Sequence, residues 1–294
     1  MDIGTQTVRL FLAETEGKTI VRPLVRKVIA ARAGEGVDRT GRLKKEAIKR
    51  TVIAIGELYA IARNAQADPI LIYATSAVRD AENREELLSE IEKMTGIRVQ
   101  VLSGEEEAAA SFLGAVGGRR GSQAVMDIGG GSTEILFGVD ARQTYAHSFQ
   151  LGAVRLGERY GCYGKEAEKS VRYAVCEALN AESEAAQLTG REVSWTGVAG
   201  TLTSLCAWDK QLKAYDSDEI QDAVLTKASI DQMADALAEM DAESRSTIPC
   251  LQKHRIDIIG PGAWILAEIA DYFKIDRIRV SEQDGLQGFM MMQL

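Results

Sequence analysis

Two stretches of this chain, separated by 125 residues from Asp2 to Asp127, carry the same pattern of an aspartate, a glycine turn and hydroxyl side chains. Residues 127–134 read Asp-Ile-Gly-Gly-Gly-Ser-Thr-Glu, and residues 2–9 read Asp-Ile-Gly-Thr-Gln-Thr-Val-Arg. A strand, a turn and a second strand, repeated once at the spacing of a domain, predict two similar lobes that face each other across a cleft. Two unrelated hairpins with glycine turns are the alternative.

The triple-glycine turn is typical of a loop that binds phosphate. Glycines lack a Cβ atom and can adopt positive φ, so that successive backbone N–H groups converge on one anion. The hydroxyls of Ser132 and Thr133 add donors, and the carboxylate of Asp127 can hold a cation. We therefore expect each lobe to present one such loop to a phosphate-bearing ligand.

The length of 294 residues is enough for two domains, at about 100–200 residues each. We place the boundary at the basic, glycine-rich stretch 117–121, so that the domains are 1–117 and 118–294. No apolar run approaches the roughly 18 residues of a membrane span, and no signal peptide is recognisable, so we expect a cytoplasmic protein without a membrane partner. Four cysteines without a Cys-x-x-Cys pair, and two histidines, argue against a zinc site or a disulfide framework.

The net charge of −8 argues at first sight against a polyanionic substrate, and we expect no specific nucleic-acid partner. The distribution of charge is uneven, however. Ten basic residues and three acidic ones lie between Arg22 and Arg50. This strip can concentrate anions locally on an acidic protein, unless its side chains simply form a solvated helix face.

Strands and helices alternate along the chain, which predicts mixed sheets covered by helices, with ligands at the carboxyl ends of the strands. In the first lobe the expected helices are 43–64 and one that starts at Asn83 with Glu86 at the capping-box position. The expected strands of the two lobes are 8–13, 25–30, 70–74, 97–102, 123–127, 133–139, 143–149, 192–196 and 278–281. The later helices are expected at about 227–240, 255–273 and 285–292.

Three consecutive glutamates follow a serine in the segment 102–110. Ser103 and Glu106 form a Ser-x-x-Glu capping box, and Glu105 faces the positive end of the helix. Glu107 lies beyond the box, where it can project into the cleft as a general base or remain an ordinary surface residue.

Two further segments have the residue types of phosphate contacts. Arg79 follows an apolar strand, where its guanidinium can span two phosphate oxygens or pair with Asp80. Residues 197–201, Gly-Val-Ala-Gly-Thr, form a glycine turn that opens a helix, which is a weak signal by itself.

Taken together, the motifs resemble those of the exopolyphosphatase and guanosine pentaphosphate phosphohydrolase family (Ppx/GppA), in its short two-domain type. The matching segments are 2–4, 74–80, 102–108, 127–134, 151–156 (Leu-Gly-Ala-Val-Arg-Leu) and 197–201. The resemblance implies a two-lobed α/β fold of the actin-like superfamily, which includes sugar kinases and acetate kinase, with a central cleft. The first loop departs from the family's usual Gly-Ser-Asn-Ser, and only Met1 precedes Asp2 where the family has a full strand.

The resemblance also implies roles for single residues. Glu107 would be the base for the attacking water and Glu134 the second essential carboxylate, while Asp2 and Asp127 would face Mg²⁺. The residues implied to bind phosphate are Gly4, Thr5, Thr7, Arg79, Gly129, Gly130, Gly131, Ser132, Thr133, Gly200 and Thr201.

The function expected from this resemblance is Mg²⁺-dependent hydrolysis of the terminal phosphate of inorganic polyphosphate. Guanosine pentaphosphate as substrate is the nearest alternative. A kinase of the same superfamily is disfavoured by the compact second lobe, and the altered first loop keeps open a module that binds polyphosphate or an alarmone without turnover. Neither chain-length preference nor oligomeric state can be deduced from the sequence, although a homodimer is compatible with it.

Overall fold

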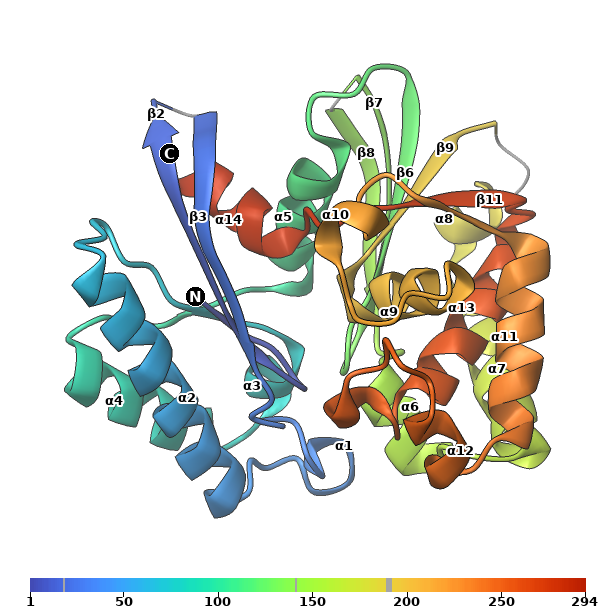
Figure 1. The fold of residues 1–294 in the computed structure, drawn as a ribbon, viewed down its shortest axis with the longest axis horizontal. Helices are drawn as coiled ribbons and strands as arrows, with labels where there is room; N and C mark the ends of the chain where they lie inside the picture. The colour runs from blue at the N-terminus through green and yellow to red at the C-terminus, as the bar shows by residue number, and fades with distance from the viewer. Residues whose placement is uncertain (18, 141, 189–191) are drawn as a thin grey trace.

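The computed structural model describes residues 1–17, 19–140, 142–188 and 192–294. Within them the chain forms two lobes, each built on its own mixed sheet (Figure 1). The first lobe holds the N-terminal part of the chain, and the second holds most of the residues after 121. The predicted α/β class is confirmed.

The sheet of the first lobe is built around a short central strand. β1 runs antiparallel to β2 and parallel to β4. In spatial order its strands are β3 (Thr19–Ile29), β2 (Val8–Glu16), β1 (Asp2–Ile3), β4 (Tyr73–Ala74) and β5 (Gln100–Val101). Its helices are α1 (Val37–Thr40), α2 (Lys45–Asn64), α3 (Ser76–Asp80) and α4 (Arg84–Thr95). Helix α2 packs on β2 and α4 through fully buried residues such as Ile55 and Leu58.

The second sheet repeats this order of strands. Three consecutive antiparallel strands are followed by strands that join in parallel, and in spatial order they are β8 (Arg142–Phe149), β7 (Thr133–Val139), β6 (Ser122–Ile128), β9 (Ser194–Val198), β11 (Arg277–Val280) and β10 (Val224–Thr226), the last antiparallel. Because β8-β7-β6-β9-β11 matches β3-β2-β1-β4-β5, the two lobes have one topology. This duplication confirms the predicted two-lobed actin-like fold.

Helices surround the second sheet and supply most of its core. They are α6 (Ala153–Tyr160), α7 (Lys165–Ala181), α8 (Ser183–Ala186), α9 (Ala199–Asp209), α10 (Ser217–Ile220), α11 (Lys227–Glu239), α12 (Ala242–Ser246), the 3₁₀ helix η1 (Lys253–Arg255) and α13 (Ile259–Phe273). Helix α13 is apolar on nearly every side and packs between α7 and α11. The indole of its fully buried Trp264 donates to the carbonyl of Ala234 at 3.1 Å, so the buried polar atom is satisfied.

Two helices lie between the sheets, α5 (Gly104–Val116) and α14 (Gly285–Gln293) (Figure 1). They touch through glycines. A Cβ atom on Gly288 would lie 1.7 Å from the carbonyl oxygen of Ala110, and one on Gly114 would lie 2.1 Å from that of Asp284. The predicted Ser103–Glu106 capping box is present at the start of α5. The division of the chain at residue 117, just beyond α5, stays a prediction.

Most expected elements are present, with differences at their ends. Strand β7 has the expected bounds, and α2 begins two residues later than predicted. The predicted capping box at Asn83 is wrong, because the Asn83 side chain instead bonds to the backbone of Leu43, accepting at 2.8 Å and donating at 3.1 Å. None of the helices in the described ranges has the length and apolar character that crossing a bilayer requires.

Candidate active site

The two glycine turns predicted from the sequence have the same geometry and face one cavity. In the first, Asp2 pairs with Arg9 across β1 and β2, and the N–H of Gly4 donates to Thr7 at 3.0 Å. In the second, Asp127 pairs with Glu134 across β6 and β7, and the N–H of Gly129 donates to Ser132, also at 3.0 Å. The motif that is repeated after 125 residues in the sequence is therefore also repeated in the three-dimensional structure. Both turns line a cavity of about 100 Å³ between the lobes.

The glycines of the second turn are required for close contact. The expectation that they adopt positive φ is wrong, since none of Gly129, Gly130 and Gly131 lies in the left-handed region. A Cβ atom on Gly130 would lie 2.9 Å from the Cβ of Thr5, and one on Gly131 would lie 2.5 Å from the hydroxyl of Ser76. Glycine is needed here because the opposite lobe packs directly on the loop.

The carbonyl groups of Gly129, Gly130 and Gly131 point toward helix α6. The carbonyl of Gly129 accepts from the N–H of Ala153 at 3.0 Å, and that of Gly130 accepts from Val154 at 2.9 Å and Arg155 at 3.1 Å. In a planar trans peptide the next N–H points the opposite way. The N–H groups of residues 130, 131 and 132 therefore turn away from α6, and in the described part of the chain they donate to no protein acceptor. Anion-binding nests are built from rows of free donors of this kind.

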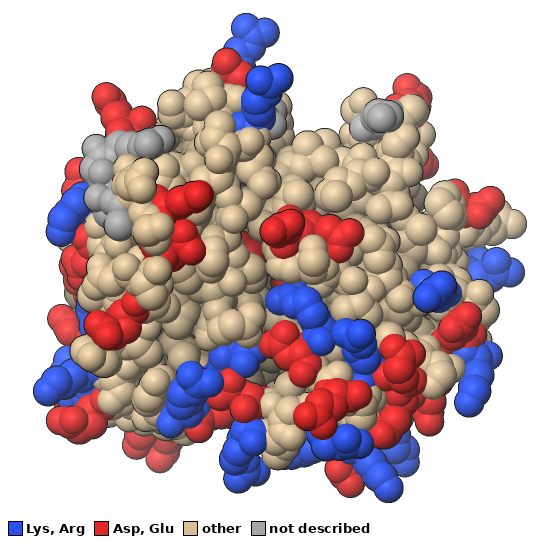
Figure 2. Space-filling model, turned by 180° about the vertical axis from the view of Figure 1, so that it is seen from behind, with Lys and Arg blue, Asp and Glu red and all other residues tan. Residues whose placement is uncertain are grey.

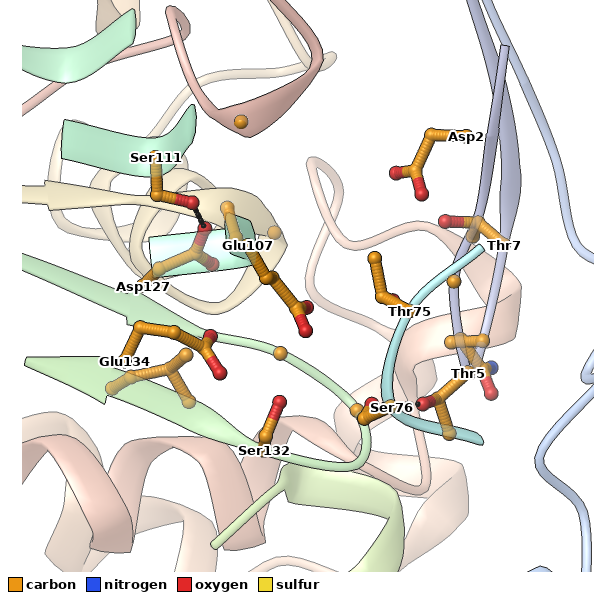
Figure 3. Close-up of a pocket in the computed structure, with 18 of the residues that line it drawn as sticks. Asp2, Thr5, Thr7, Thr75, Ser76, Glu107, Ser111, Asp127, Ser132 and Glu134 are labelled. Atoms are coloured by element: carbon orange, nitrogen blue, oxygen red, sulfur yellow. Dashed lines mark hydrogen bonds between the residues drawn. The ribbon is translucent and has the colours of Figure 1, made fainter. Parts of the chain in front are cut away.

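Four carboxylates from both lobes surround the cavity beside this row of donors (Figure 3). Glu107 projects from α5 into the space between the two lobes, and its Oε2 accepts from Arg79 at 2.7 Å. Asp127 and Glu134 lie behind it, accepting from Ser111 and Ser148 respectively, each at 2.6 Å. On the opposite side, Asp2 accepts from Arg9 Nε at 2.7 Å.

Burial of these carboxylates raises their pKa values. Desolvation raises the pKa of Glu107 to about 7, against the opposing charge of Arg79, and raises that of Asp127 to about 6. It raises the pKa of Glu134 well above its usual range, with the charges of Glu107 and Asp127 adding to the effect. Neighbouring acids whose pKa values are pushed apart can take separate roles, one as a base and one as a proton holder.

The donors at this site fit a hard divalent cation. The Oδ1 atom of Asp2 is buried and has no hydrogen-bond partner, and Asp127 faces the same cavity. No group of three or more His, Cys, Asp or Glu side chains in the described ranges is close enough to enclose a metal ion. Mg²⁺ is commonly held by one or two carboxylates together with waters and substrate phosphates. One carboxylate ligand from each lobe is therefore a sufficient contribution from the protein.

Comparison with known proteins identifies the family. The sequence profile of the Ppx/GppA phosphatase family matches residues 12–291. The chain belongs to this family. It is 32% identical over 311 residues to exopolyphosphatase 2 of Mycobacterium tuberculosis, an alignment that covers 99% of this chain and 96% of the relative.

Solved structures of family members show the same fold. An exopolyphosphatase-like protein superposes with a TM-score of 0.90 at 30% identity, covering 99% of this chain and 96% of the other. The Ppx/GppA protein of Aquifex aeolicus superposes with a TM-score of 0.80 at 26% identity, covering 99% and 95%. This Ppx/GppA chain is therefore a phosphatase, and dependence on a divalent metal in general accords with its family.

Most residues predicted for the site line the cavity. They are Asp2, Gly4, Thr5, Thr7, Glu107, Asp127, Gly129, Gly130, Ser132, Glu134, Gly200 and Thr201. Three predicted phosphate contacts are placed differently. Arg79 holds Glu107 and the carbonyl of Leu102, Thr133 donates its hydroxyl to the carbonyl of Leu151, and Gly131 packs against the opposite lobe.

Arg255 is a site residue that the sequence analysis missed. It lies at the end of η1, and its guanidinium packs so closely on Gly200 that a Cβ atom there would lie 1.7 Å from Nη2. Burial lowers its pKa to about 10, and its side chain makes no ion pair or hydrogen bond among the described residues. It lines both the cavity between the lobes and a second one of about 330 Å³. No motif marks it, because it sits in an irregular segment beside other basic residues.

The basic strip between Arg22 and Arg50 does not form a continuous basic surface. Arg22 pairs with Glu14, and Lys44 and Arg50 share Glu35. Arg42 pairs with two glutamates as well. On the face seen in Figure 2, acidic and basic side chains are mixed over the lower half, and the upper half is mostly uncharged. The predicted strip can therefore attract anions only locally, through single basic residues.

Proposed function

We propose that this Ppx/GppA phosphatase is an exopolyphosphatase that hydrolyses the terminal phosphate of inorganic polyphosphate with the help of Mg²⁺. The observation that carries the proposal is the position of Glu107, a largely buried carboxylate with a pKa of about 7. It projects into the cavity that is also lined by Gly130 and Ser132, whose N–H groups donate to no protein acceptor in the described part of the chain. Relatives that carry the name exopolyphosphatase support it.

The arrangement supports an in-line attack by water on the terminal phosphorus. Glu107 accepts a proton from the water while the water oxygen bonds to phosphorus. At the same time the bridging P–O bond breaks, and the electron pair of that bond leaves with the shortened polyphosphate chain. Phosphoryl transfer depends mainly on positioning and on stabilising negative charge, and the N–H groups of the second turn supply that stabilisation. A base whose pKa lies near neutrality suits this step.

The other carboxylates take supporting roles in the proposal. Glu134, whose pKa is raised well above its usual range, holds a proton and orients the water from the other side. Asp2 and Asp127 would hold Mg²⁺, which supplies neutralisation of phosphate charge when bound. Arg79 keeps the Glu107 carboxylate in place rather than binding phosphate itself.

The remainder of the substrate is proposed to lie in the second cavity, past Arg255. The two cavities share Arg9, Gly200 and Arg255 as lining residues. The second is also lined by the cations of Arg26 and Lys27 and by the acids Glu282 and Asp284. Arg255 has no protein partner among the described residues, and phosphate oxygens would satisfy its donors. Arg255→Gln should raise KM for polyphosphate more than tenfold, which steady-state assays can measure.

Guanosine pentaphosphate is a second candidate substrate, favoured by residues of the second cavity. Phe11 is buried beneath the guanidinium of Arg26, and both Phe11 and Tyr215 line it. The planar guanidinium of Arg26 is a group on which a base can stack. The terminal anhydride would be attacked in the same way.

Phosphate release by the purified protein tests these proposals. Polyphosphate, guanosine pentaphosphate and ATP are compared at equal concentrations of phosphate ends, with Glu107→Gln as the inactive reference. We expect kcat/KM to be highest for polyphosphate. A preference for guanosine pentaphosphate would reverse the ranking, and binding of polyphosphate without release by the unmodified protein would make it a sensor instead.

Time courses with polymers of defined length show how the chain is held. Contacts restricted to the two cavities predict release between cuts, so that a ladder of intermediates appears on a gel and binding weakens with salt. Conversion of long polymers to phosphate without intermediates would contradict this.

We also propose that the protein acts in the cytoplasm. Cys162, Cys176, Cys206 and Cys250 are all free thiols, as is usual in a reducing compartment. The homodimer remains a prediction, which light scattering on the purified protein can test.

A further inference from the structure

Arg155 links the phosphate-binding turn to the opposite lobe. It belongs to the 151–156 motif, and its side chain on α6 is only 11% exposed. Its Nε donates to the carbonyl of Gly131 at 2.6 Å, Nη1 to Asp38 at 2.7 Å and Nη2 to Asp80 at 2.6 Å. One planar guanidinium thus bonds to three segments at once: the β6–β7 turn, α1 and α3.

The contact with Gly131 bears on the direction of a neighbouring N–H group. Holding the carbonyl of Gly131 toward α6 turns the N–H of Ser132 the opposite way, toward the cavity. The carbonyls of Gly129 and Gly130 are already held by backbone N–H groups of α6. Arg155 is therefore the side chain that completes the alignment of the turn.

The contact with Asp80 reaches the proposed base. Asp80 is next to Arg79 on the five-residue helix α3, and Arg79 holds the Glu107 carboxylate at 2.7 Å. The Arg155–Asp80 bond fixes α3 relative to the second lobe. The same guanidinium thus sets the positions of the phosphate-binding turn and of the helix that orients Glu107.

We propose that Arg155 is a positioning residue that aligns the two halves of the catalytic site. The inference rests on the proposed function, because it assigns a consequence for phosphoryl transfer. Arg155 touches no substrate in this scheme. It acts through the Gly131 carbonyl on one side and through Asp80 and Asp38 on the other.

The chain contains a matched control in Arg159. It lies one turn further along α6 and donates to the same Asp38 at 2.8 Å, but it bonds neither Gly131 nor Asp80 and its side chain is 47% exposed. Loss of Arg155 leaves Asp38 paired with Arg159, and Asp80 within 3.7 Å of Arg79. Neither carboxylate is left without a cation, so the fold should tolerate the change.

Steady-state kinetics and thermal unfolding of Arg155→Gln, Arg155→Lys and Arg159→Gln test the inference. Arg155→Gln should lower kcat/KM by about 10–100-fold, somewhat less than the loss of a direct oxyanion donor, with Tm lowered by only a few degrees. Arg155→Lys should recover little, because an ammonium cannot satisfy three acceptors in a plane. Arg159→Gln should stay within twofold of the unmodified protein. Full recovery by lysine, or equal losses at positions 155 and 159, would overturn the proposal.

Binding of inorganic phosphate, measured by calorimetry, separates this inference from the proposed function. Arg155→Gln should bind phosphate at least tenfold more weakly than the unmodified protein, and Arg159→Gln should bind it equally well. Should the unmodified protein release no phosphate from polyphosphate while these binding differences hold, the proposed function fails and the role of Arg155 stands. Equal phosphate binding by all three proteins would overturn the role of Arg155.

Discussion

The hairpin of the first lobe and the hairpin of the second have the same backbone and opposite electrostatics. Asp2 lies across from Arg9, and Asp127 lies across from Glu134, at equivalent positions of the two strand pairs. Arg9 also pairs with Asp284, so the first hairpin carries its own counter-charge. In the second hairpin an acid faces an acid, and the pKa values of both are raised.

This difference shows how two copies of one structural unit can take different roles in the same site. In the first hairpin Arg9 supplies a cation inside the protein, although burial still raises the pKa of Asp2 and leaves its Oδ1 without a hydrogen-bond partner. In the second hairpin, only protons or an external cation can balance the negative charge. This lowers the stability of the fold, and it is expected of a site that binds a metal ion for catalysis. The two hairpins share their backbone geometry because they are copies of one unit. They differ in charge because the position across from the aspartate holds Arg9 in the first and Glu134 in the second.

The largest expected effect concerns Glu107, the proposed base beside the acidic hairpin. Glu107→Gln should lower kcat by about 10²–10⁴-fold with little change in KM, because it removes proton acceptance but keeps the shape. The neighbouring Glu106→Gln is the control, since Glu106 caps the helix through the N–H of Ser103 at 2.8 Å and a glutamine can do the same at a cost of about 1 kcal/mol or less. Equal losses of activity in the two variants would remove Glu107 from its role.

Next in size is the loss of the internal counter-charge in the first hairpin. Arg9→Met should destabilise the protein by about 3–5 kcal/mol, because it leaves the buried Asp2 and Asp284 without a cation. Urea unfolding measures it. Arg22→Met, which breaks the fully exposed pair with Glu14, should show no measurable change. An Arg9→Met protein as stable as its parent would mean that the two hairpins do not differ in the way described.

A smaller effect is expected from pH on the acidic hairpin. Burial raises the folded-state pKa of Asp127 from 3.8 to about 6 and that of Glu107 from 4.5 to about 7. Raised carboxyl pKa values stabilise the fold below the unfolded pKa, and this stability is lost as pH rises through the folded pKa, here between about pH 4 and pH 7. The metal-free protein should thus have a Tm about 5 °C lower at pH 8 than at pH 5.

Magnesium should reverse this loss, since it binds ionised carboxylates. Calorimetry with MgCl₂, against NaCl at equal ionic strength, should show a larger rise in Tm at pH 8 than at pH 5. The same rise at both pH values would show that the acidic cluster is not the binding site.

The smallest expected effect is that of Asp127→Asn. Removing this charge should weaken apparent Mg²⁺ affinity by about 10–100-fold, so activity falls at low Mg²⁺ and recovers in part at high Mg²⁺. Asp231→Asn, on the distant helix α11, is the control. Unchanged activity at low Mg²⁺ would assign Asp127 a structural role.

The sequence predicted the parts of the site that rest on local patterns. The duplicated turn, the bounds of β7 and the capping box before Glu107 depend on residues that are close together in the chain. The lobes face each other as the repeat implied. Most residues predicted for the site line one cavity for this reason.

The features that the sequence could not predict depend on contacts between distant segments. The partner of Asp2 is Arg9, whose alignment with Glu134 was visible but whose ion pair with Asp284, 275 residues away, was not. The glycines of residues 129–131 are required by Thr5 and Ser76 of the other lobe, which local conformation does not reveal. The roles proposed for Arg255 and Arg155 rest on tertiary contacts. Although Arg155 belongs to the 151–156 motif, the motif does not reveal these contacts.

The contact of α14 with α5 has a consequence for the synthesis of the protein. Asp284 and the helix after it complete the surroundings of Arg9 and of the helix that carries Glu107. These residues are translated 275 positions after Arg9, which at typical elongation rates is a delay of about 14–55 s. A nascent chain in that interval lacks both the counter-charge and the packing of its catalytic helix. We therefore expect ribosome-bound chains to be inactive, with hydrolysis of phosphate polymers beginning only when α14 has emerged.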